Sequence, residues 1–452
     1  MRTHMTQLIM PATYYERHPD DPERFQLPEI VRTYSVSPSQ FGIGADLAPN
    51  SITAYEVSDP YLEQIPEGRL DEIRAQETLA NSYARLRRVR GLWDRNPGTA
   101  YQDSNGDVRQ KSRLEWGDPE SRNRFFGDGA DGLGDEALRA WLTLVPSAAA
   151  LAYLSDPFNT TAIRNRRGNS YAATEATCEW LAACTDAADI RGRAAGLAEE
   201  VREYVTWRTF QYPGEPLTMM SVACGTALPT MQAVMRANAP NATLLLVDKD
   251  KRSMSLTSQL AQEIGFSGTL QSKNHDIFDR DVMRKLRQEL TNDADRRPHL
   301  VDAMGIFEYT GEELRPPGDT SDSLLYDPAG FLRACYDLVR PGGRLIFGQM
   351  RDDRPNADFT MGVVCWPYVC MRNPKRLMEI IQKAGINPRW VNLSLTPHGV
   401  YTIASIDKPA RGLPEQAPFA EHDAHSPAPD RRSPVPAALQ MARRALRVAL
   451  SV

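Results

Sequence analysis

Short apolar runs alternate with helix-length amphipathic segments from residue 216 onward. The runs that we expect to be strands are Leu217–Cys224, Thr243–Val247, Thr269–Lys273, His299–Met304, Arg344–Gln349, Arg389–Ser394 and Val400–Ile406. The segments that we expect to be helices are one that follows Cys224 and ends at Arg236, then Ser253–Ile264, Asp281–Leu290, Pro328–Val339 and Pro374–Ala384. Alternation of this kind is typical of βαβ units. The pattern therefore predicts an α/β domain with a mostly parallel sheet over residues 213–407.

The pattern before residue 213 is mostly helical. Asp71–Trp93 has acidic residues early and arginines late, as the helix dipole favours. Its apolar residues near helical spacing are Ile73, Leu79, Tyr83, Leu86 and Val89. Helical pattern resumes over Asp135–Ala152 and Tyr171–Phe210, whereas residues 95–135 are polar and predict a loop. We expect residues 1–60 to form an extended arm or irregular cap and residues 61–212 a mostly α-helical cap or substrate region.

The C-terminal tail has a composition of its own. Residues 408–436 are rich in proline, which predicts a linker. Residues 437–452 place leucines on one helical face, with Arg443, Arg444 and Arg447 largely opposite. We expect an amphipathic C-terminal helix that docks on the chain or binds a partner or an anionic surface.

Composition narrows the class of protein. The 452 residues include 53 Lys and Arg and 58 Asp and Glu, for a net charge of −5, which argues against a protein that coats nucleic acid. No apolar run reaches the roughly 18–20 residues of a membrane span, and the N-terminus carries no signal-peptide h-region. The 6 cysteines are scattered and do not suggest a disulfide framework. We expect a cytoplasmic globular protein that uses neither nucleic acid nor a membrane span.

Three features at predicted strand ends point to a nucleoside site. Gly225 lies in a turn between the first strand and its helix, where the backbone can approach a ligand. Asp248 ends the second strand about 20 residues later, at the spacing of an acid that binds ribose hydroxyls. Asp276 follows the third strand, where it can accept from an exocyclic amine while Ile277 packs on the base. Each could also be an ordinary turn, cap or loop residue.

At these positions residues 216–407 resemble the class I S-adenosylmethionine-dependent methyltransferase superfamily. Val222–Thr226 (VACGT) resembles its glycine-rich first motif, Leu244–Asp250 (LLLVDKD) its second-strand acid and His275–Ile277 its adenine-side acid. Leu338–Leu345 (LVRPGGRL) resembles the L-x-P-G-G-x-L turn before the fifth strand. Asp302–Tyr309 (DAMGIFEY) further resembles S-A-G-L-F-D-Y in a branch that includes proteins assigned to making hydroxy-fatty-acid methyl esters, whose substrate is not transferred to this chain.

The resemblance implies a Rossmann-like, seven-stranded methyltransferase sheet in the order 3-2-1-4-5-7-6, with the seventh strand antiparallel, preceded by the mostly α-helical region. It also implies S-adenosylmethionine as the cofactor. The residues that it places at the cofactor are Ala223, Cys224, Gly225, Asp248, Lys249, Asp276, Ile277, Ala303, Met304 and Gly305.

One departure from the family concerns the first motif, which usually reads acid-x-G-x-G-x-G. The corresponding residues here are Ser221, Ala223, Gly225 and Ala227, so one glycine remains and the acid is absent. Because that acid usually helps to hold the amino group of the cofactor, another residue has to replace it.

Methyl transfer from a sulfonium depends mainly on placing the acceptor and excluding water. A general base is needed only for a poorly acidic hydroxyl or an ammonium, and the candidates are Glu308, Tyr309 and His275. Asp302, near the end of the fourth strand, could act by hydrogen bonding.

Candidate substrate-binding residues follow the fifth strand or lie in the helical region. They are Met350, Arg351, Trp366, Arg372 and, in a compact basic cluster, Arg167. Cys365 and Cys370 have no second pair at zinc spacing, so no metal is assigned.

We therefore expect a methyltransferase of secondary metabolism that acts on a small molecule, by O-methylation first and N-methylation second. One alternative is transfer or cyclisation of the aminocarboxypropyl arm of S-adenosylmethionine, which would release methylthioadenosine. Another is a catalytically inactive, methyltransferase-like scaffold subunit. A homodimer remains open.

Overall fold

The computed structural model describes residues 25–410 except 93–99, 103–107, 111–116, 130–131, 146, 240, 292–295, 316–317 and 367–368. All of these belong to the first of two units of the chain, Met1–Glu415, and the second unit, Gln416–Val452, lies outside the described residues. The predicted C-terminal helix and nearly all of the predicted linker therefore also lie outside them.

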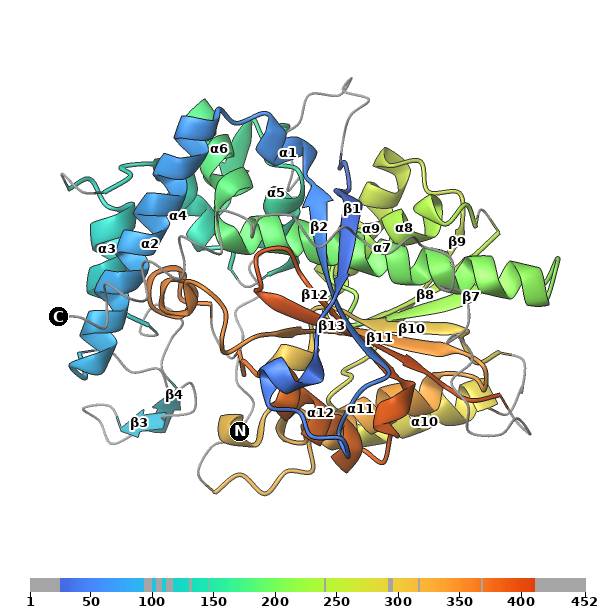
Figure 1. The fold of residues 1–452 in the computed structure, drawn as a ribbon. Helices are drawn as coiled ribbons and strands as arrows, with labels where there is room; N and C mark the ends of the chain where they lie inside the picture. Colours follow the sequence, from blue (N-terminus) through green and yellow to red (C-terminus); the bar gives the residue numbers. More distant parts are fainter. Residues whose placement is uncertain are drawn as a thin grey trace, which may run out of the picture. The chain divides into compact units, whose positions relative to one another are not determined.

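A nine-stranded sheet forms the centre of the described chain (Figure 1). Its strands, in order across the sheet, are β1 (Glu29–Ser35), β2 (Ser51–Ser58), β12 (Val391–Leu395), β13 (Tyr401–Asp407), β11 (Arg344–Met350), β10 (Leu300–Ala303), β7 (Thr218–Val222), β8 (Thr243–Asp248) and β9 (Thr269–Asn274). Every strand predicted after residue 216 is present. The predicted α/β class is confirmed.

The strand order matches the one implied by the resemblance. Numbered within the α/β part, β9-β8-β7-β10-β11-β13-β12 reads 3-2-1-4-5-7-6, and β13 is antiparallel to both of its neighbours. The expectation of seven strands is corrected to nine, because β1 and β2 form an antiparallel hairpin and β2 pairs in parallel with β12. Most of β1 is polar or exposed, so its sequence lacks the strict alternation that would predict a strand.

Helices cover both faces of the sheet, and each face has its own apolar core. On one side lie α7 (Thr185–Gln211), α8 (Leu228–Arg236) and α9 (Lys251–Glu263), and on the other α10 (Arg280–Thr291), α11 (Pro328–Leu338) and α12 (Pro374–Lys383) (Figure 1). Met304 belongs to the first core and Ala303 to the second, as alternation along a strand requires.

Residues 60–211 are mostly helical. Besides α7 they form α1 (Pro60–Glu63), α2 (Glu67–Val89), α3 (Pro119–Phe126), α4 (Glu136–Leu142), α5 (Ala148–Ser155) and α6 (Glu175–Ala183), with short hairpins β3 (Ala100–Gln102)–β4 (Val108–Gln110) and β5 (Ala162–Arg164)–β6 (Ser170–Ala172). The region predicted as a loop, 95–135, thus includes β3, β4 and α3, and the helix predicted over 135–152 is two helices.

The apolar pattern of α2 marks its buried face only in part. Ile73 of that pattern is fully buried, as is Ala84, whereas Leu79, Leu86 and Val89 are 70%, 46% and 72% exposed. The helix is held by a polar contact as well, because the buried Glu77 carboxylate accepts from the Thr185 amide and hydroxyl, both at 2.9 Å.

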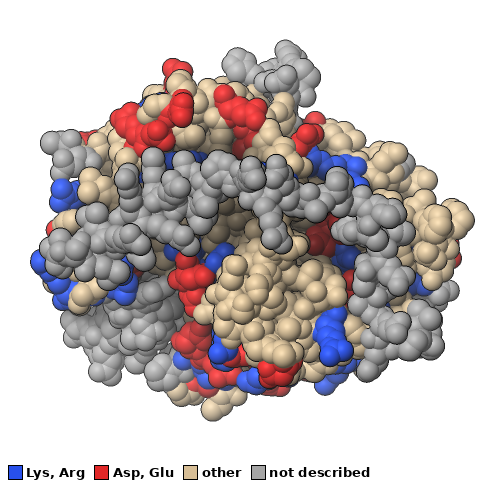
Figure 2. All heavy atoms as spheres, in the orientation of Figure 1, with Lys and Arg blue, Asp and Glu red and all other residues tan. Residues whose placement is uncertain are grey.

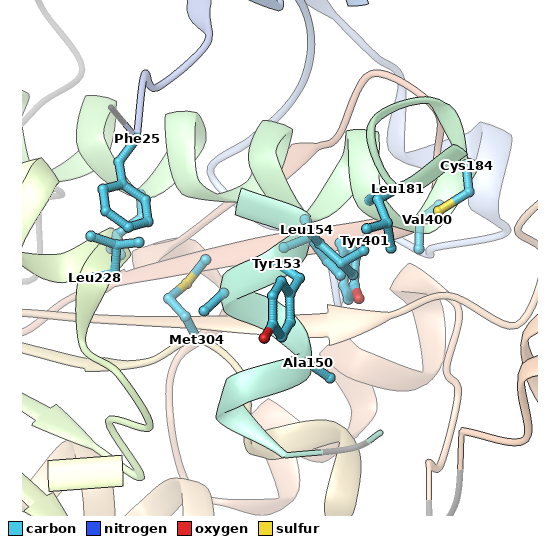
Figure 3. Close-up of a cluster of buried hydrophobic side chains, with 14 of the residues drawn as sticks. Phe25, Ala150, Tyr153, Leu154, Leu181, Cys184, Leu228, Met304, Val400 and Tyr401 are labelled. Atoms are coloured by element: carbon cyan, nitrogen blue, oxygen red, sulfur yellow. The ribbon is translucent and has the colours of Figure 1, made fainter. Parts of the chain in front are cut away.

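The long helix α7 lies directly against the sheet. The Tyr55 hydroxyl of β2 donates to the Gly192 carbonyl at 3.0 Å, and a Cβ at Gly196 would overlap Tyr55 and Ile403. Figure 3 shows the buried cluster that joins the helical region to the sheet, with Tyr153 and Leu154 of α5 near Tyr401 of β13. This close packing fixes the side chains of α7 relative to the strand ends.

The first described residues pack against α8. Arg236 donates to the carbonyls of Leu27 and Pro28 at 3.2 and 2.9 Å, and Phe25 points toward Leu228 (Figure 3). Acidic and basic side chains are interspersed on the face drawn in Figure 2. No helix among the described residues has both the length and the apolar character of a membrane span.

Candidate functional site

A cavity of about 610 Å³ lies at the carboxyl ends of β7, β8, β9 and β10. Its volume falls in the usual range of small-molecule sites, about 300–1,000 Å³. Helices α5 and α7 form the opposite wall through side chains such as Leu151, Ile190 and Leu197, and Gln26 and Leu27 also line it. Ligands of open α/β sheets bind at strand ends of this kind.

The turn after β7 has three residues with a left-handed backbone, and two of them are alanine. Ala223, Gly225 and Ala227 have φ values of 52°, 53° and 49°, in the left-handed region. A residue with a Cβ is disfavoured there by about 1–2 kcal/mol, so the chain tolerates strain at two positions to form this turn. Ala223, Cys224 and Gly225 all line the cavity.

Asp248, at the end of β8, also lines the cavity. Its carboxylate accepts from the Gly225 amide at 2.9 Å and from the Asp250 amide at 2.8 Å. Burial raises the pKa of Asp248, and these amide bonds oppose the shift. The Lys249 amide also bonds to this carboxylate. Because a carboxylate has about four acceptor sites, one remains for a ligand while the side chain also holds the turn.

Asp276 and Lys249 form the more exposed part of the wall. The Asp276 carboxylate accepts from the Phe278 amide at 3.0 Å and lies 3.5 Å from the Lys249 ammonium. Exposed ion pairs of this kind contribute only about 0–1 kcal/mol, so a ligand can replace the lysine. Ile277, beside Asp276, is buried and lines the cavity as well.

At the end of β10 the wall consists of Asp302, Met304 and Gly305. Ala303, predicted beside them, is absent from the wall because its side chain packs in the core on the other face of the sheet. Asp302 is 2% exposed and accepts from the hydroxyls of Ser221 at 3.1 Å and Thr230 at 3.2 Å.

The sequence analysis missed Arg193 of α7. Its guanidinium lines the cavity, lies 3.4 Å from the Glu308 carboxylate and covers the ring of Tyr401 at 4.4 Å from the ring centroid. The available signal was an arginine within an Ala- and Gly-rich helical run, which would be buried on nearly every side.

Two of the three candidate bases lie on this side. Tyr309 lines the cavity, and its hydroxyl accepts from the Trp366 indole N–H at 2.7 Å. Burial and the neighbouring Glu308 raise the pKa of Tyr309, which keeps its hydroxyl protonated and able to donate. Glu308 is off the wall, behind Arg193, and burial raises the pKa of its carboxyl.

Among the described residues that line the cavity there is neither the third candidate base nor any of the five candidate substrate residues. His275 is half-buried, with its amide bonded to the Asp248 carbonyl at 3.1 Å. Trp366 contacts the site only through Tyr309. Arg351 pairs with Asp353 at 2.7 Å.

Three further candidates also lie away from the described wall. Met350 is buried at the end of β11. Arg372 is buried and donates to the Gln349 side chain at 2.7 Å and to the Thr310 carbonyl. Arg167 is exposed in the turn between β5 and β6. Within the described ranges, no three His, Cys, Asp or Glu side chains are arranged to hold a metal ion.

Comparison with known proteins shows distant structural similarity only. No family model and no curated protein matches the chain. Similar solved structures include a possible exported protein from Bordetella parapertussis, with 14% identity over 58% of this chain and 80% of that chain and a TM-score of 0.41. An O-methyltransferase family protein from Burkholderia thailandensis has 15% identity over 73% and 83%, with a TM-score of 0.35. Magnesium protoporphyrin IX methyltransferase from Synechocystis, solved with bound S-adenosylhomocysteine, has 13% identity over 50% and 87%, with a TM-score of 0.33.

Proposed function

We propose that the protein is an S-adenosylmethionine-dependent methyltransferase that methylates a small molecule, on oxygen in preference to nitrogen. The observation that carries this proposal is that Asp248, Asp276 and the Gly225 turn line one cavity at the carboxyl ends of adjacent parallel strands. The strand order of the sheet supports the same assignment.

The residues present fit the cofactor by the chemistry of their side chains. Asp248 keeps an acceptor site for a ribose hydroxyl, and Asp276 with Ile277 offers an acceptor and an apolar surface for adenine. A Cβ added at Gly225 would meet Ala148 of α5 at 3.4 Å, so the turn and the helical region already approach closely without one. Bound S-adenosylmethionine would supply an electrophilic methyl group.

The opposite part of the cavity favours an acceptor with an acidic oxygen. The Arg193 guanidinium attracts an anion and disfavours an ammonium acceptor, and the protonated Tyr309 hydroxyl can donate to an oxygen. A carboxylate or an acidic hydroxyl needs no strong base. We therefore assign Tyr309 to orienting the acceptor and Glu308 to holding Arg193. The covering helices α5 and α7 exclude water from the acceptor.

The test is ligand binding followed by product analysis. S-adenosylhomocysteine at about 100 times its Kd should stabilise the full chain by about 2.7 kcal/mol. Incubation with methyl-labelled S-adenosylmethionine and a panel of small carboxylic acids, phenols and amines should label an acid or a phenol and release S-adenosylhomocysteine. Methylthioadenosine as the product would point to transfer of the aminocarboxypropyl arm. Failure to bind S-adenosylhomocysteine would refute the proposal.

A further inference from the structure

The first strand of the α/β part, β7, has no acid at the position where the first motif that it resembles usually begins with one. Ser221 occupies the place of the acid in the glycine-rich motif, and its hydroxyl carries no charge for a cation. Ser221 is 2% exposed and lines the cavity. If the cavity receives an amino acid arm, its ammonium group needs a counter-charge from another element.

A carboxylate lies at the same level on the next strand. β10 pairs in parallel with β7, and Asp302 is in register with Ser221. The two side chains point to the same side of the sheet, because the Ser221 hydroxyl donates to Asp302 Oδ1 at 3.1 Å. The negative charge is thus displaced by one strand from β7 to β10, at the same height along the sheet.

Three donors hold this carboxylate in place. The hydroxyls of Ser221 and Thr230 bond to its two oxygens, and the Met304 amide also bonds to it. Among the described residues no cation forms an ion pair with Asp302. Since Asp302 lines the cavity, a ligand cation can reach it.

The surrounding groups explain why an unpaired carboxylate here is costly. Burial raises the pKa of Asp302 to about 7, and its hydrogen bonds only partly oppose that shift. The other titratable groups on this part of the wall are Cys224 and Asp248, and the Asp302 charge contributes to raising the pKa of the Cys224 thiol. Among the described residues the cations on the wall are Arg191, Arg193 and Lys249, which are engaged with Asp59, Glu308 and Asp276.

We infer that Asp302 binds the α-ammonium group of the S-adenosylmethionine amino acid arm and replaces the acid absent at Ser221. This inference rests on the proposed function. It assigns Asp302 to the cofactor, and the acceptor is left to Arg193 and Tyr309.

The experiment is a cycle of two proteins and two ligands, measured by isothermal titration calorimetry. The proteins are the full-length wild type and Asp302→Asn, which keeps the shape and one oxygen acceptor. The ligands are S-adenosylhomocysteine and its desamino analogue, which lacks only the amine. We expect the substitution to weaken the binding of S-adenosylhomocysteine by about 10- to 100-fold, as for the loss of a charged hydrogen bond. It should weaken the binding of the desamino analogue by less than threefold. Equal weakening of both ligands, or of neither, would overturn the inference.

Two controls separate this result from misfolding and from failure of the proposed function. Methylthioadenosine lacks the whole arm, so its affinity should be equal in both proteins. If Asp302→Asn does not fold, Asp302→Ser takes its place in the cycle with the same expectation. If the wild type binds neither S-adenosylhomocysteine nor methylthioadenosine, the proposed function fails. If it binds both and the cycle shows no coupling, only the role of Asp302 fails.

Discussion

The cavity wall has two parts that are built in different ways: the ends of β8 and β9, and the end of β10 together with the helix α7 that faces it. On the wall of β8 and β9, Asp248 and Asp276 are held by amides of nearby turns and remain open to solvent on one side. On the wall of β10 and α7, the bonds of Asp302 and Arg193 join residues 81 and 115 positions apart in the chain, and both side chains are buried. The first wall suits hydrogen bonding to an uncharged nucleoside. The second wall holds buried charged groups in a low-dielectric environment, where they act strongly on a ligand.

This difference predicts that charge removal is most costly on the buried wall. Arg193→Met leaves the Glu308 carboxylate buried without its cation, and we expect the free energy of unfolding to fall by about 3–5 kcal/mol. Urea denaturation of the full chain measures it. The matched control is Arg202→Met, also on α7. Arg202 and its partner Glu199 are both partly exposed, so the loss of this pair should lower the free energy of unfolding by less than about 1 kcal/mol.

The double variant Arg193→Met/Glu308→Gln sharpens this comparison. It removes both charges, so it should recover a large part of the lost stability. If the single variant loses less than about 1 kcal/mol, the buried pair does not have the role assigned to it.

The next effect concerns pH and again distinguishes the walls. Asp302 has a pKa of about 7 in the free protein, and an ammonium ligand binds its ionised form. Affinity for S-adenosylhomocysteine should therefore rise with pH between 6 and 8, with a limiting slope of about tenfold per unit below pH 7. Methylthioadenosine should show a flatter profile, because only Asp248 and Asp276 face it. An equal pH profile in Asp302→Asn would contradict the assignment.

The smallest effect tests strain in the turn between the walls. Ala223→Gly relieves a left-handed alanine at the cost of some unfolded-state entropy, and we expect a gain of about 0.5–1 kcal/mol in the free energy of unfolding. Ala233→Gly, in the interior of α8, should instead lose about 1 kcal/mol or more. Thermal denaturation of the two variants gives the signs, and a loss for Ala223→Gly would show that the turn is not strained.

The same contrast explains how far the sequence predicted the structure. Strands such as Thr243–Asp248 are continuous apolar runs, so the α/β part was predictable from periodicity. The strand order was predictable only from the family resemblance. Asp248 ends such a run and Asp276 follows the more polar strand β9, and the structure places both at the cavity.

Contacts between distant segments were not predictable. β1 and β2 join the sheet through pairing with β12, which no local pattern indicates. Arg193 meets Glu308 only because α7 packs closely on the sheet through Gly192 and Gly196. Trp366 and Arg372 looked like substrate residues because they are aromatic or charged, but in the fold they bond to other residues of the protein.

The central claim is that Asp248 binds an adenosyl nucleoside at the strand ends. The most direct measurement is the Kd of methylthioadenosine for the wild type and Asp248→Asn by isothermal titration calorimetry, with Asp281→Ala, an exposed carboxylate on α10, as the control. The account predicts a loss of about 1.5–3 kcal/mol, or roughly 10- to 100-fold, for Asp248→Asn and no change for the control. An unchanged Kd in folded Asp248→Asn would contradict it.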